Sequence, residues 1–168
     1  QMQKNLNLKV KFRESFRPFA PSILRQDLEE WFDISIDSPY MLMVSNINKD
    51  KVIEMTETQK KLFGIDKLNI KRSEIPAVTH VDYSSRIQTV HKETNERYFK
   101  LIQKFKEKTN CPVLVNTSFN VRGEPIVNTP LDAFNCFMGT DLEKLAIGNC
   151  YLDKVDQDPL LKKDYTSE

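Results

Sequence analysis

The stretch that decides the fold runs from Thr94 to Gly123 and has the sequence TNERYFKLIQKFKEKTNCPVLVNTSFNVRG. Residues 94–108 repeat apolar side chains at helical spacing opposite lysine and glutamate, which predicts an amphipathic helix. Residues 111–115 are continuously apolar and predict a buried, central strand. The polar residues 116–123 follow the carboxyl end of that strand, where open α/β sheets place their ligands.

Shorter patterns on both sides of this stretch predict the remaining elements. Thr129 and Pro130 are typical of a helix N-terminus, and the apolar residues after them predict a helix that ends at Gly139. Another helix is expected over residues 23–32, with Ser22 as its N-cap. Strands or extended segments are expected at residues 9–13, 41–45, 75–82, 86–90, 145–147 and 151–152.

Strands that alternate with three helices predict an α/β (α+β) fold with a mixed, twisted sheet flanked by helices. The length of 168 residues and the hydrophobic content of 39% suffice for one ordinary domain. We expect residues 8–155 to form that domain, with residues 1–7 as an edge or linker and residues 156–168 as a loose tail. The charged segment 46–73 carries no recognisable motif.

Charge and composition argue against several classes of protein. The 25 Lys+Arg and 24 Asp+Glu residues give a net charge of +1, so no overall field attracts nucleic acid or an anionic membrane. The sequence has neither a long apolar run nor a signal-peptide pattern, which predicts a cytoplasmic protein with no membrane partner. Cysteines and histidines lack metal-ligand spacing, and isolated glycines form no phosphate loop. Recognition of an anion must therefore be local.

The candidate functional residues are hydrogen-bond donors rather than nucleophiles. No nucleophile stands beside a histidine base, which disfavours covalent hydrolysis. Lys11 and Arg13 are two residues apart and would project from one face of a strand, and Ser118 and Asn120 have the same spacing. Arginine binds phosphate oxygens in pairs, lysine adds a point charge, and hydroxyl and amide groups orient a neutral group. Such a set suits an acyl phosphate or a nucleoside triphosphate.

Simpler interpretations stay open on these residues alone. A Lys-x-Arg pair on an exposed strand is usually a solvated surface, and Ser-Phe-Asn after a strand is usually a turn with an Asx hydrogen bond. His80 and Asp82 suit structural hydrogen bonding better than catalysis. Without further comparison, the sequence indicates an α/β domain with candidate anion-binding donors.

Four segments of the chain, taken together and in order, resemble a known family. They are KFRESFRPFAPS at 11–22, AVTHVDYSSRIQTV at 77–90, NTSFNVRGEPIV at 116–127 and TPLDA at 129–133. In this order they closely resemble the C-terminal domain of the carbamoyltransferases, the group of nodulation-type and antibiotic O-carbamoyltransferases. The resemblance covers residues from about 8 to 152.

This resemblance implies a YrdC-like fold that binds carbamoyl phosphate and ATP, with Mg²⁺ carried on the phosphate oxygens. It implies that carbamoyl-adenylate forms and pyrophosphate leaves. The carbamoyl group then passes to a hydroxyl acceptor at a separate N-terminal Kae1-like domain that holds iron. Those N-terminal sequences are absent from this chain, so we expect it to be the adenylate-forming half of a longer enzyme.

The resemblance also implies roles for particular residues. The catalytic residues would be those of the family's Lys-x-Arg and Ser-x-Asn signatures together with one motif arginine: Lys11, Arg13, Ser118, Asn120 and Arg86. Secondary contacts with the substrates are expected from Arg17, Thr79 and Arg122, and no protein-built metal site is expected. Tyr83 departs from the family, in which glycine often stands at this position, and it adds bulk to the turn before Arg86.

Other functions stay open. One is threonylcarbamoyl-adenylate synthesis from threonine and bicarbonate for tRNA modification, but the FRPFAP and Asp-Ala motifs resemble the O-carbamoyltransferases instead. Another is a non-catalytic YrdC-like module that binds duplex RNA, against which the net charge of +1 argues. A third possibility is a domain that folds but is inactive without its N-terminal partner.

Overall fold

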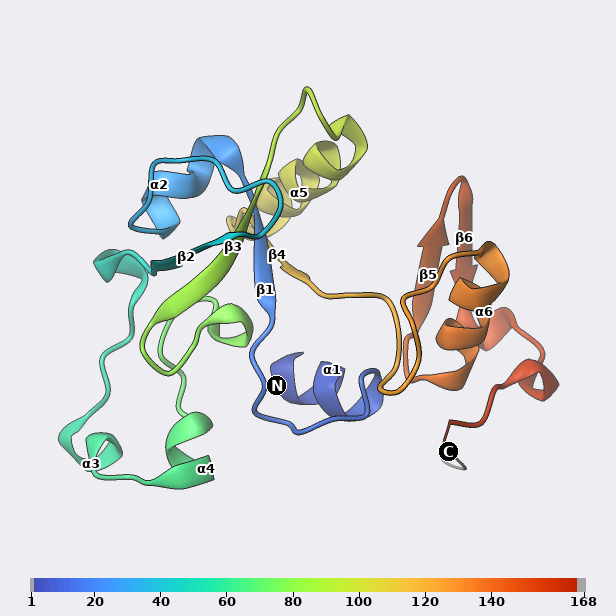
Figure 1. Cartoon of the computed structure of the whole chain (residues 1–168), viewed down its shortest axis with the longest axis horizontal. Coiled ribbons are helices and arrows are strands. Elements are labelled where there is room, and N and C mark those ends of the chain that lie inside the picture. The colour runs from blue at the N-terminus through green and yellow to red at the C-terminus, as the bar shows by residue number, and fades with distance from the viewer. Residues whose placement is uncertain (1, 166–168) are drawn as a thin grey trace. The chain divides into compact units, whose positions relative to one another are not determined.

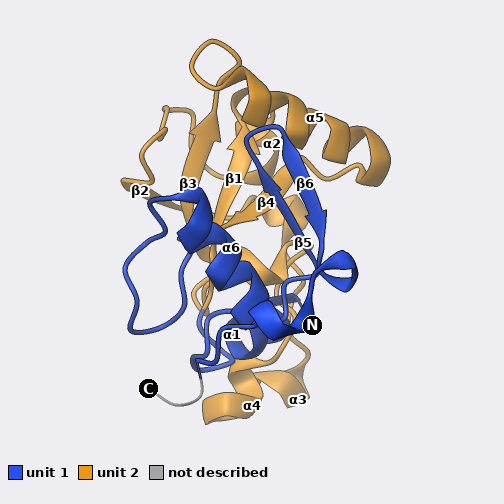
Figure 2. Ribbon diagram, turned by 90° about the vertical axis from the view of Figure 1, so that its right-hand side faces the viewer, with its two compact units in different colours: residues 1–17, 118–168 blue, residues 18–117 orange. Residues whose placement is uncertain are grey.

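The computed structural model describes residues 2–165, and the chain divides into two compact units. Unit 1 consists of residues 1–17 and 118–168, and unit 2 of residues 18–117 (Figure 2). Residue 1 and residues 166–168, which belong to the expected edge and tail, lie outside the described residues. None of the helices in the described part of the chain is both long and apolar enough to cross a membrane.

Unit 2 is built on a mixed four-stranded sheet in the order β2-β3-β1-β4 (Figure 1). Its strands are β1 (Ala20–Leu24), β2 (Met43–Asn46), β3 (Ser84–Val90) and β4 (Val113–Asn116). Strand β1 pairs in parallel with β3 and antiparallel with β4, and β2 pairs antiparallel with β3. The mixed sheet and its helices confirm the predicted α/β class.

Strand β1 includes the first two residues of the helix predicted over residues 23–32, so that prediction is wrong in part. All of β1 is buried, because this central strand carries apolar residues on both faces, and such a run imitates helical spacing. Pro21 also favours an extended residue before it. Helical structure begins only at a 3₁₀ turn, Arg25–Asp27, and continues in α2 (Leu28–Trp31). Ser22 therefore caps no helix.

Helix α5 (Glu96–Thr109) confirms the clearest prediction from the sequence. The Asn95 side chain caps it by accepting a hydrogen bond from the Tyr98 amide, and Asn110 ends it in the left-handed region. Ile102 packs with Leu24 and Val90 in the core of unit 2. The strand predicted over residues 111–115 is also confirmed as β4. Its expected central position is wrong, because β4 lies at an edge of the sheet.

The segment between β2 and β3 contains only single turns of helix. They are a 3₁₀ turn at Lys49–Lys51, α3 (Glu57–Lys60) and α4 (Gly64–Leu68). An isolated β-bridge between Val52 and Ser73 closes this segment. The extended path predicted over residues 75–82 is wrong in part, because Pro76–Val78 forms a 3₁₀ turn.

Unit 1 contains the helices α1 (Met2–Lys9) and α6 (Pro130–Gly139) and a hairpin of β5 (Lys144–Ile147) and β6 (Cys150–Asp153). The strands predicted at residues 145–147 and 151–152 are confirmed as β5 and β6, and the predicted helix is confirmed as α6. Helix α6 begins with a capping box. The Thr129 side chain accepts a hydrogen bond from the backbone N–H of Asp132, and the Asp132 side chain accepts one from the backbone N–H of Thr129. The core of this unit consists of Phe137, Met138 and Leu145. Two 3₁₀ turns follow the hairpin, Lys154–Asp156 and Pro159–Leu161.

The strand predicted over residues 9–13 is wrong, because α1 extends to Lys9 and a turn follows it. The turn is held by Asn7, which is fully buried and donates from its side-chain amide to the carbonyl oxygens of Ser15 (3.1 Å) and Arg17 (2.8 Å). Phe12 has a φ of 47°, in the left-handed region. Hydrogen bonds from one buried side chain to residues 8 and 10 positions further along the chain thus override the local alternation.

Candidate functional site

Lys11 lies at the centre of a buried hydrogen-bond cluster in unit 1, with 5% of its surface exposed. Its Nζ donates to the carbonyl oxygen (2.9 Å) and Oγ (3.2 Å) of Ser118. It also donates to the carbonyl oxygen (2.7 Å) and Oδ1 (2.6 Å) of Asn120. The structure thus brings together three of the residues predicted for the site, and we call these three the Lys11 cluster.

The ammonium of Lys11 has only neutral oxygens as its partners. None of the ion pairs among the described residues includes Lys11. Burial, and after it the positive charge of Arg13, lowers the pKa of Lys11. A buried cation without a counter-charge favours the approach of an anion. Ser118 is exposed, so solvent reaches one side of the cluster.

The orientation of Asn120 is fixed by hydrogen bonds on both sides of its amide. Its Nδ2 donates to the carbonyl oxygen of Glu124 (2.8 Å), and its Oδ1 accepts from the Ser118 hydroxyl (2.7 Å) as well as from Lys11. The oxygen of this amide therefore faces the ammonium. Val121, which is buried, anchors the loop directly after Asn120.

Arg13 is oriented by the same buried asparagine that shapes the turn. Its Nε donates to Asn7 Oδ1 (2.6 Å), and its backbone N–H donates to the carbonyl oxygen of Asn7 (3.0 Å). Burial, and after it the charge of Arg17, lowers the pKa of Arg13. Because Phe12 stands between them in the left-handed region, Lys11 and Arg13 do not share the face of a strand as predicted.

Arg17 and Arg122 are exposed and flank one carboxylate in unit 1. Glu14 lies 3.7 Å from the Arg17 guanidinium and 3.9 Å from that of Arg122. A hydrogen bond with its own backbone, followed by the charges of Arg122 and Arg17, lowers the pKa of Glu14. Exposed pairs of this kind are weak, so both arginines can exchange Glu14 for another anion at little cost.

Thr79 and Arg86 belong to unit 2, and their predicted contacts with substrate stay predictions. Thr79 is buried, and its hydroxyl already binds Ser73 Oγ (2.6 Å) and the carbonyl oxygen of Ile75 (2.8 Å). These bonds give Thr79 a structural role. Arg86 is exposed on β3, where it pairs in register with Val44.

Sequence reasoning missed a neutral hydrogen-bond network on the sheet of unit 2. Gln88 Oε1 accepts from the Ser22 hydroxyl (2.7 Å) and from Asn116 Nδ2 (2.6 Å), and Gln88 Nε2 donates to the carbonyl oxygen of Pro39 (3.1 Å). A signal was present, since Gln88 stands two residues after Arg86 in the same motif and therefore on the same face of β3. Asn7 carries no comparable signal, and Glu124 stands in a motif but acts through its backbone oxygen, which its residue type does not indicate.

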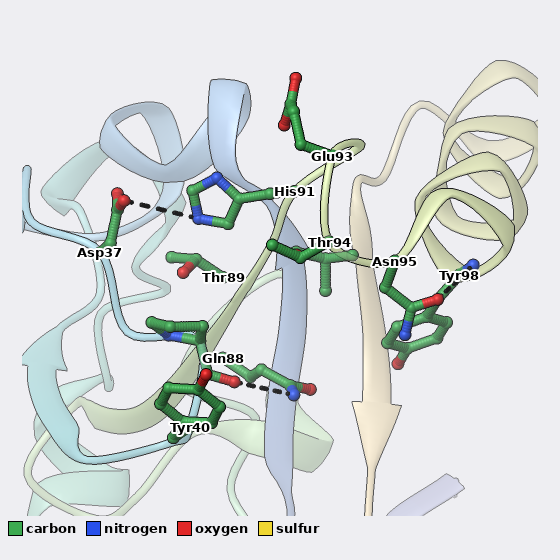
Figure 3. A pocket seen from close by; sticks show the side chains of 11 residues that line it. Asp37, Tyr40, Gln88, Thr89, His91, Glu93, Thr94, Asn95 and Tyr98 are labelled. Carbon is green, nitrogen blue, oxygen red and sulfur yellow. Dashed lines mark hydrogen bonds and ion pairs between the residues drawn. The ribbon is translucent and has the colours of Figure 1, made fainter.

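A cleft of about 540 Å³ lies in unit 2 beside this network (Figure 3). In its walls, His91 Nε2 lies 3.6 Å from Asp37 Oδ2. Tyr98 also lines it, and burial raises the pKa of that phenol. None of the predicted site residues belongs to the lining of this cleft.

Amide, hydroxyl and cationic groups make up the candidate site. Within residues 2–165, no group of three or more His, Cys, Asp and Glu side chains is placed to hold a metal ion. The ammonium, hydroxyl, amide and carbonyl groups of the Lys11 cluster can bind an anionic ligand by hydrogen bonding and charge stabilisation.

Comparison with known proteins identifies the family. Residues 1–154 match the model of a protein family that is described as "Carbamoyltransferase C-terminus". An uncharacterized protein of Synechocystis sp. is 55% identical, over 93% of this chain and 25% of that protein. The nodulation protein NolNO of Sinorhizobium fredii is 38% identical, over 92% of this chain and 20% of its own length.

A third relative is named for its activity. The 3'-hydroxymethylcephem-O-carbamoyltransferase of Amycolatopsis lactamdurans is 27% identical, over 88% of this chain and 24% of its own length. The chain thus spans between a fifth and a quarter of the length of these relatives. The family match contains every predicted site residue, from Lys11 to Arg122. This chain belongs to the carbamoyltransferase family and corresponds to its C-terminal domain.

Proposed function

We propose that this chain is the adenylate-forming half of an O-carbamoyltransferase. It binds MgATP and carbamoyl phosphate, forms carbamoyl-adenylate and releases pyrophosphate. The carbamoyl group then passes to a hydroxyl acceptor at an N-terminal Kae1-like, iron-containing domain of a longer protein. Membership of the family supports this proposal, as does the relative from Amycolatopsis lactamdurans, which is named an O-carbamoyltransferase.

The observation that carries the proposal is the uncompensated ammonium of Lys11. An anionic oxygen about 4 Å from this ammonium would gain about 4 kcal/mol at the effective dielectric constant near a protein surface. The neutral oxygens that now surround Nζ cannot supply this Coulomb energy. An acyl phosphate or a triphosphate therefore binds here in preference to a neutral ligand.

The oxygens around Lys11 also suit a carbamoyl group. As Lys11 Nζ turns to an anionic oxygen of the substrate, carbonyl oxygens of Ser118 and Asn120 become free to accept. The carbamoyl NH₂ group has two N–H donors, and the Ser118 hydroxyl can donate to its carbonyl oxygen. The cluster thus orients both ends of this small group.

Adenylation is mainly a matter of position and charge. Hydrolysis of carbamoyl phosphate releases phosphate and leaves carbamate. An oxygen of carbamate then forms a bond to the α-phosphorus of ATP while the bond between that phosphorus and pyrophosphate breaks. Negative charge on the phosphoryl oxygens and on pyrophosphate is stabilised by Lys11, Arg13 and Arg86. Arg17 and Arg122 attract the substrates at the surface, and Mg²⁺ enters on the ATP phosphates as part of the substrate.

The test is carbamoyl-phosphate-dependent exchange of labelled pyrophosphate into ATP by the 168-residue chain. The proposal predicts exchange that is lost in Lys11→Ala and in Ser118→Ala. A Lys106→Ala variant is the matched control, because Lys106 pairs with Asp27 in unit 2. Exchange at the normal rate in Lys11→Ala would refute the assignment.

Two further arms separate the alternatives. Threonine with bicarbonate in place of carbamoyl phosphate should not support exchange, whereas a threonylcarbamoyl-adenylate synthase would use them. If the chain binds ATP but shows no exchange, adding the N-terminal part of the protein should restore it. Failure of the chain to bind ATP at all would contradict the proposed function.

A further inference from the structure

Residues 159–165, which we call the strap, follow the family match within unit 1 and pack on other parts of that unit. The match ends at residue 154. The Lys163 ammonium forms an ion pair with Glu124 and lies 4.5 Å from the centre of the Tyr165 ring. The ring of Tyr165 is 6.3 Å from that of Phe12, centre to centre. The strap therefore contacts two separate loops of unit 1.

Gly139, at the end of α6, makes this docking possible. A methyl group at this position would overlap the Tyr165 ring and approach the carbonyl oxygen of Lys163 to 2.8 Å. Gly139 does not have a positive φ, so its backbone conformation requires no glycine. The absence of a side chain at Gly139 therefore allows the strap to approach closely. Because one of the contacting atoms is a backbone oxygen, the strap has little room to shift around an added methyl group.

Both loops that the strap contacts carry members of the Lys11 cluster. Glu124, the partner of Lys163, provides the carbonyl oxygen that accepts from Asn120 Nδ2 (2.8 Å). That bond turns Asn120 Oδ1 toward Lys11 Nζ. On the other loop, Phe12 directly follows Lys11 and has a φ of 47°, a conformation that needs support from its surroundings.

We propose that the strap is a positioning element of the Lys11 cluster. Lys163 and Tyr165 hold Glu124 and Phe12 in place, and thereby keep Asn120 and Lys11 oriented for an anionic ligand. The inference rests on the proposed function for the identity of the ligand, but its geometry does not depend on that function. Release of the strap should free the Asn120 amide and expose Lys11, weakening the binding of the phosphate ligand.

The test measures how fast each lysine of the folded chain is acetylated by acetic anhydride, followed by peptide mass spectrometry. In the wild type Lys11 should react slowly, because only 5% of its surface is exposed. Gly139→Ala, which displaces the strap, should raise the Lys11 rate about tenfold by favouring local opening. Lys106 in unit 2 is the internal reference and should react at an unchanged rate.

Three further variants keep the test decisive even if Gly139→Ala fails to fold. Lys163→Ala should raise the Lys11 rate in the same way, and Lys163→Arg should restore the slow rate because it keeps the ion pair with Glu124. Leu160→Ala is the matched control, since Leu160 lies in the strap but is 90% exposed. This control should leave the Lys11 rate unchanged.

The proposal is overturned if the strap becomes sensitive to protease in Lys163→Ala while Lys11 stays as slow as in the wild type. In that case the strap covers the surface without positioning the cluster. The acetylation assay uses no substrate, so it decides this inference even if the chain shows no exchange. Where exchange is measurable, strap variants should raise KM for carbamoyl phosphate more than they lower kcat.

Discussion

Two lysines of this chain are held in opposite ways. In unit 2, Lys106 on α5 binds Asp27 Oδ1 at 2.6 Å, and Asp27 is 7% exposed. In unit 1, Lys11 is as buried as Asp27, but its ammonium donates only to hydroxyl, amide and carbonyl oxygens. The first cation is neutralised by the protein itself. The second is left for a ligand to neutralise, and this difference separates a structural lysine from a candidate binding lysine.

Lys154 shows that neutral oxygens alone do not define a binding site. Its ammonium donates to the carbonyl oxygens of Phe137 and Thr140 at the C-terminal end of α6. A helix end carries partial negative charge, which stabilises a cation there. The acceptors of Lys11 belong to the loop after β4 and have no such dipole behind them.

The largest expected effect comes from removing the uncompensated charge. Lys11→Met should lower carbamoyl-phosphate-dependent exchange about 100-fold, which corresponds to about 3 kcal/mol, the scale reported for a single oxyanion-hole donor. Lys106→Met should leave the exchange rate unchanged. The comparison fails if the two variants lose exchange equally, with circular dichroism showing that both are folded.

The next largest expected effect concerns the ion pair of Lys106 with Asp27. Asp27→Asn should lower the free energy of unfolding by about 2 kcal/mol, less than for a fully buried pair because Lys106 is partly solvated. Thermal or urea unfolding measures this loss. Exchange should be unaffected, so a drop in exchange without a drop in stability would show that Asp27 is not a purely structural partner.

Asn120→Asp should convert Lys11 into a lysine of the Lys106 kind. A carboxylate at this position would neutralise the ammonium through a charge-assisted hydrogen bond, but it would also lose the Nδ2 donor to the carbonyl oxygen of Glu124, so the free energy of unfolding should change little. The same change should weaken the binding of pyrophosphate, measured by calorimetry. Asn116→Asp is the matched control, because its neighbour Gln88 offers an oxygen instead of a cation, and it should lose stability. Tighter binding of pyrophosphate in Asn120→Asp would contradict the account.

The smallest expected effect is a pH dependence. Burial and the charge of Arg13 hold the pKa of Lys11 below its ordinary value in the folded chain. At pH values between the lowered and the ordinary pKa, the unfolded chain therefore binds more protons than the folded chain. The free energy of unfolding should therefore rise with pH across that window, and this rise should be missing in Lys11→Met. Pyrophosphate affinity should fall as pH passes the lowered pKa. Identical pH profiles of unfolding in the two proteins would exclude this linkage.

The sequence predicted elements whose cause is local. Helix α5 follows from a repeated apolar stripe, and α6 from the Thr129 cap followed by Pro130. Strands β3 and β4 follow from short apolar or alternating runs. In each case the residues that decide the structure lie within the element or next to it.

The failures have long-range causes. Asn7 bends residues 10–13 into a turn through bonds to the carbonyl oxygens of Ser15 and Arg17, which no local pattern reveals. Strand β1 looked helical because both of its faces are buried, and β4 lies at the sheet edge because strand order is not a local property.

The candidate site, too, could be predicted from the sequence only in part. The resemblance to the family selected Lys11, Ser118 and Asn120, which the fold brings into contact across more than a hundred residues of sequence. It included Glu124 in the third motif without giving it a role, although the backbone oxygen of Glu124 orients the Asn120 amide. Backbone acceptors carry no residue-type signal, so a motif identifies side chains and misses the atoms that orient them.

The most direct test of the central claim is the ¹³Cε chemical shift of Lys11 as a function of pH, with and without carbamoyl phosphate or pyrophosphate. The account predicts that Lys11 titrates below an ordinary lysine in the free chain and that either ligand raises its pKa. Binding of these ligands with no change in the titration of Lys11 would contradict the account.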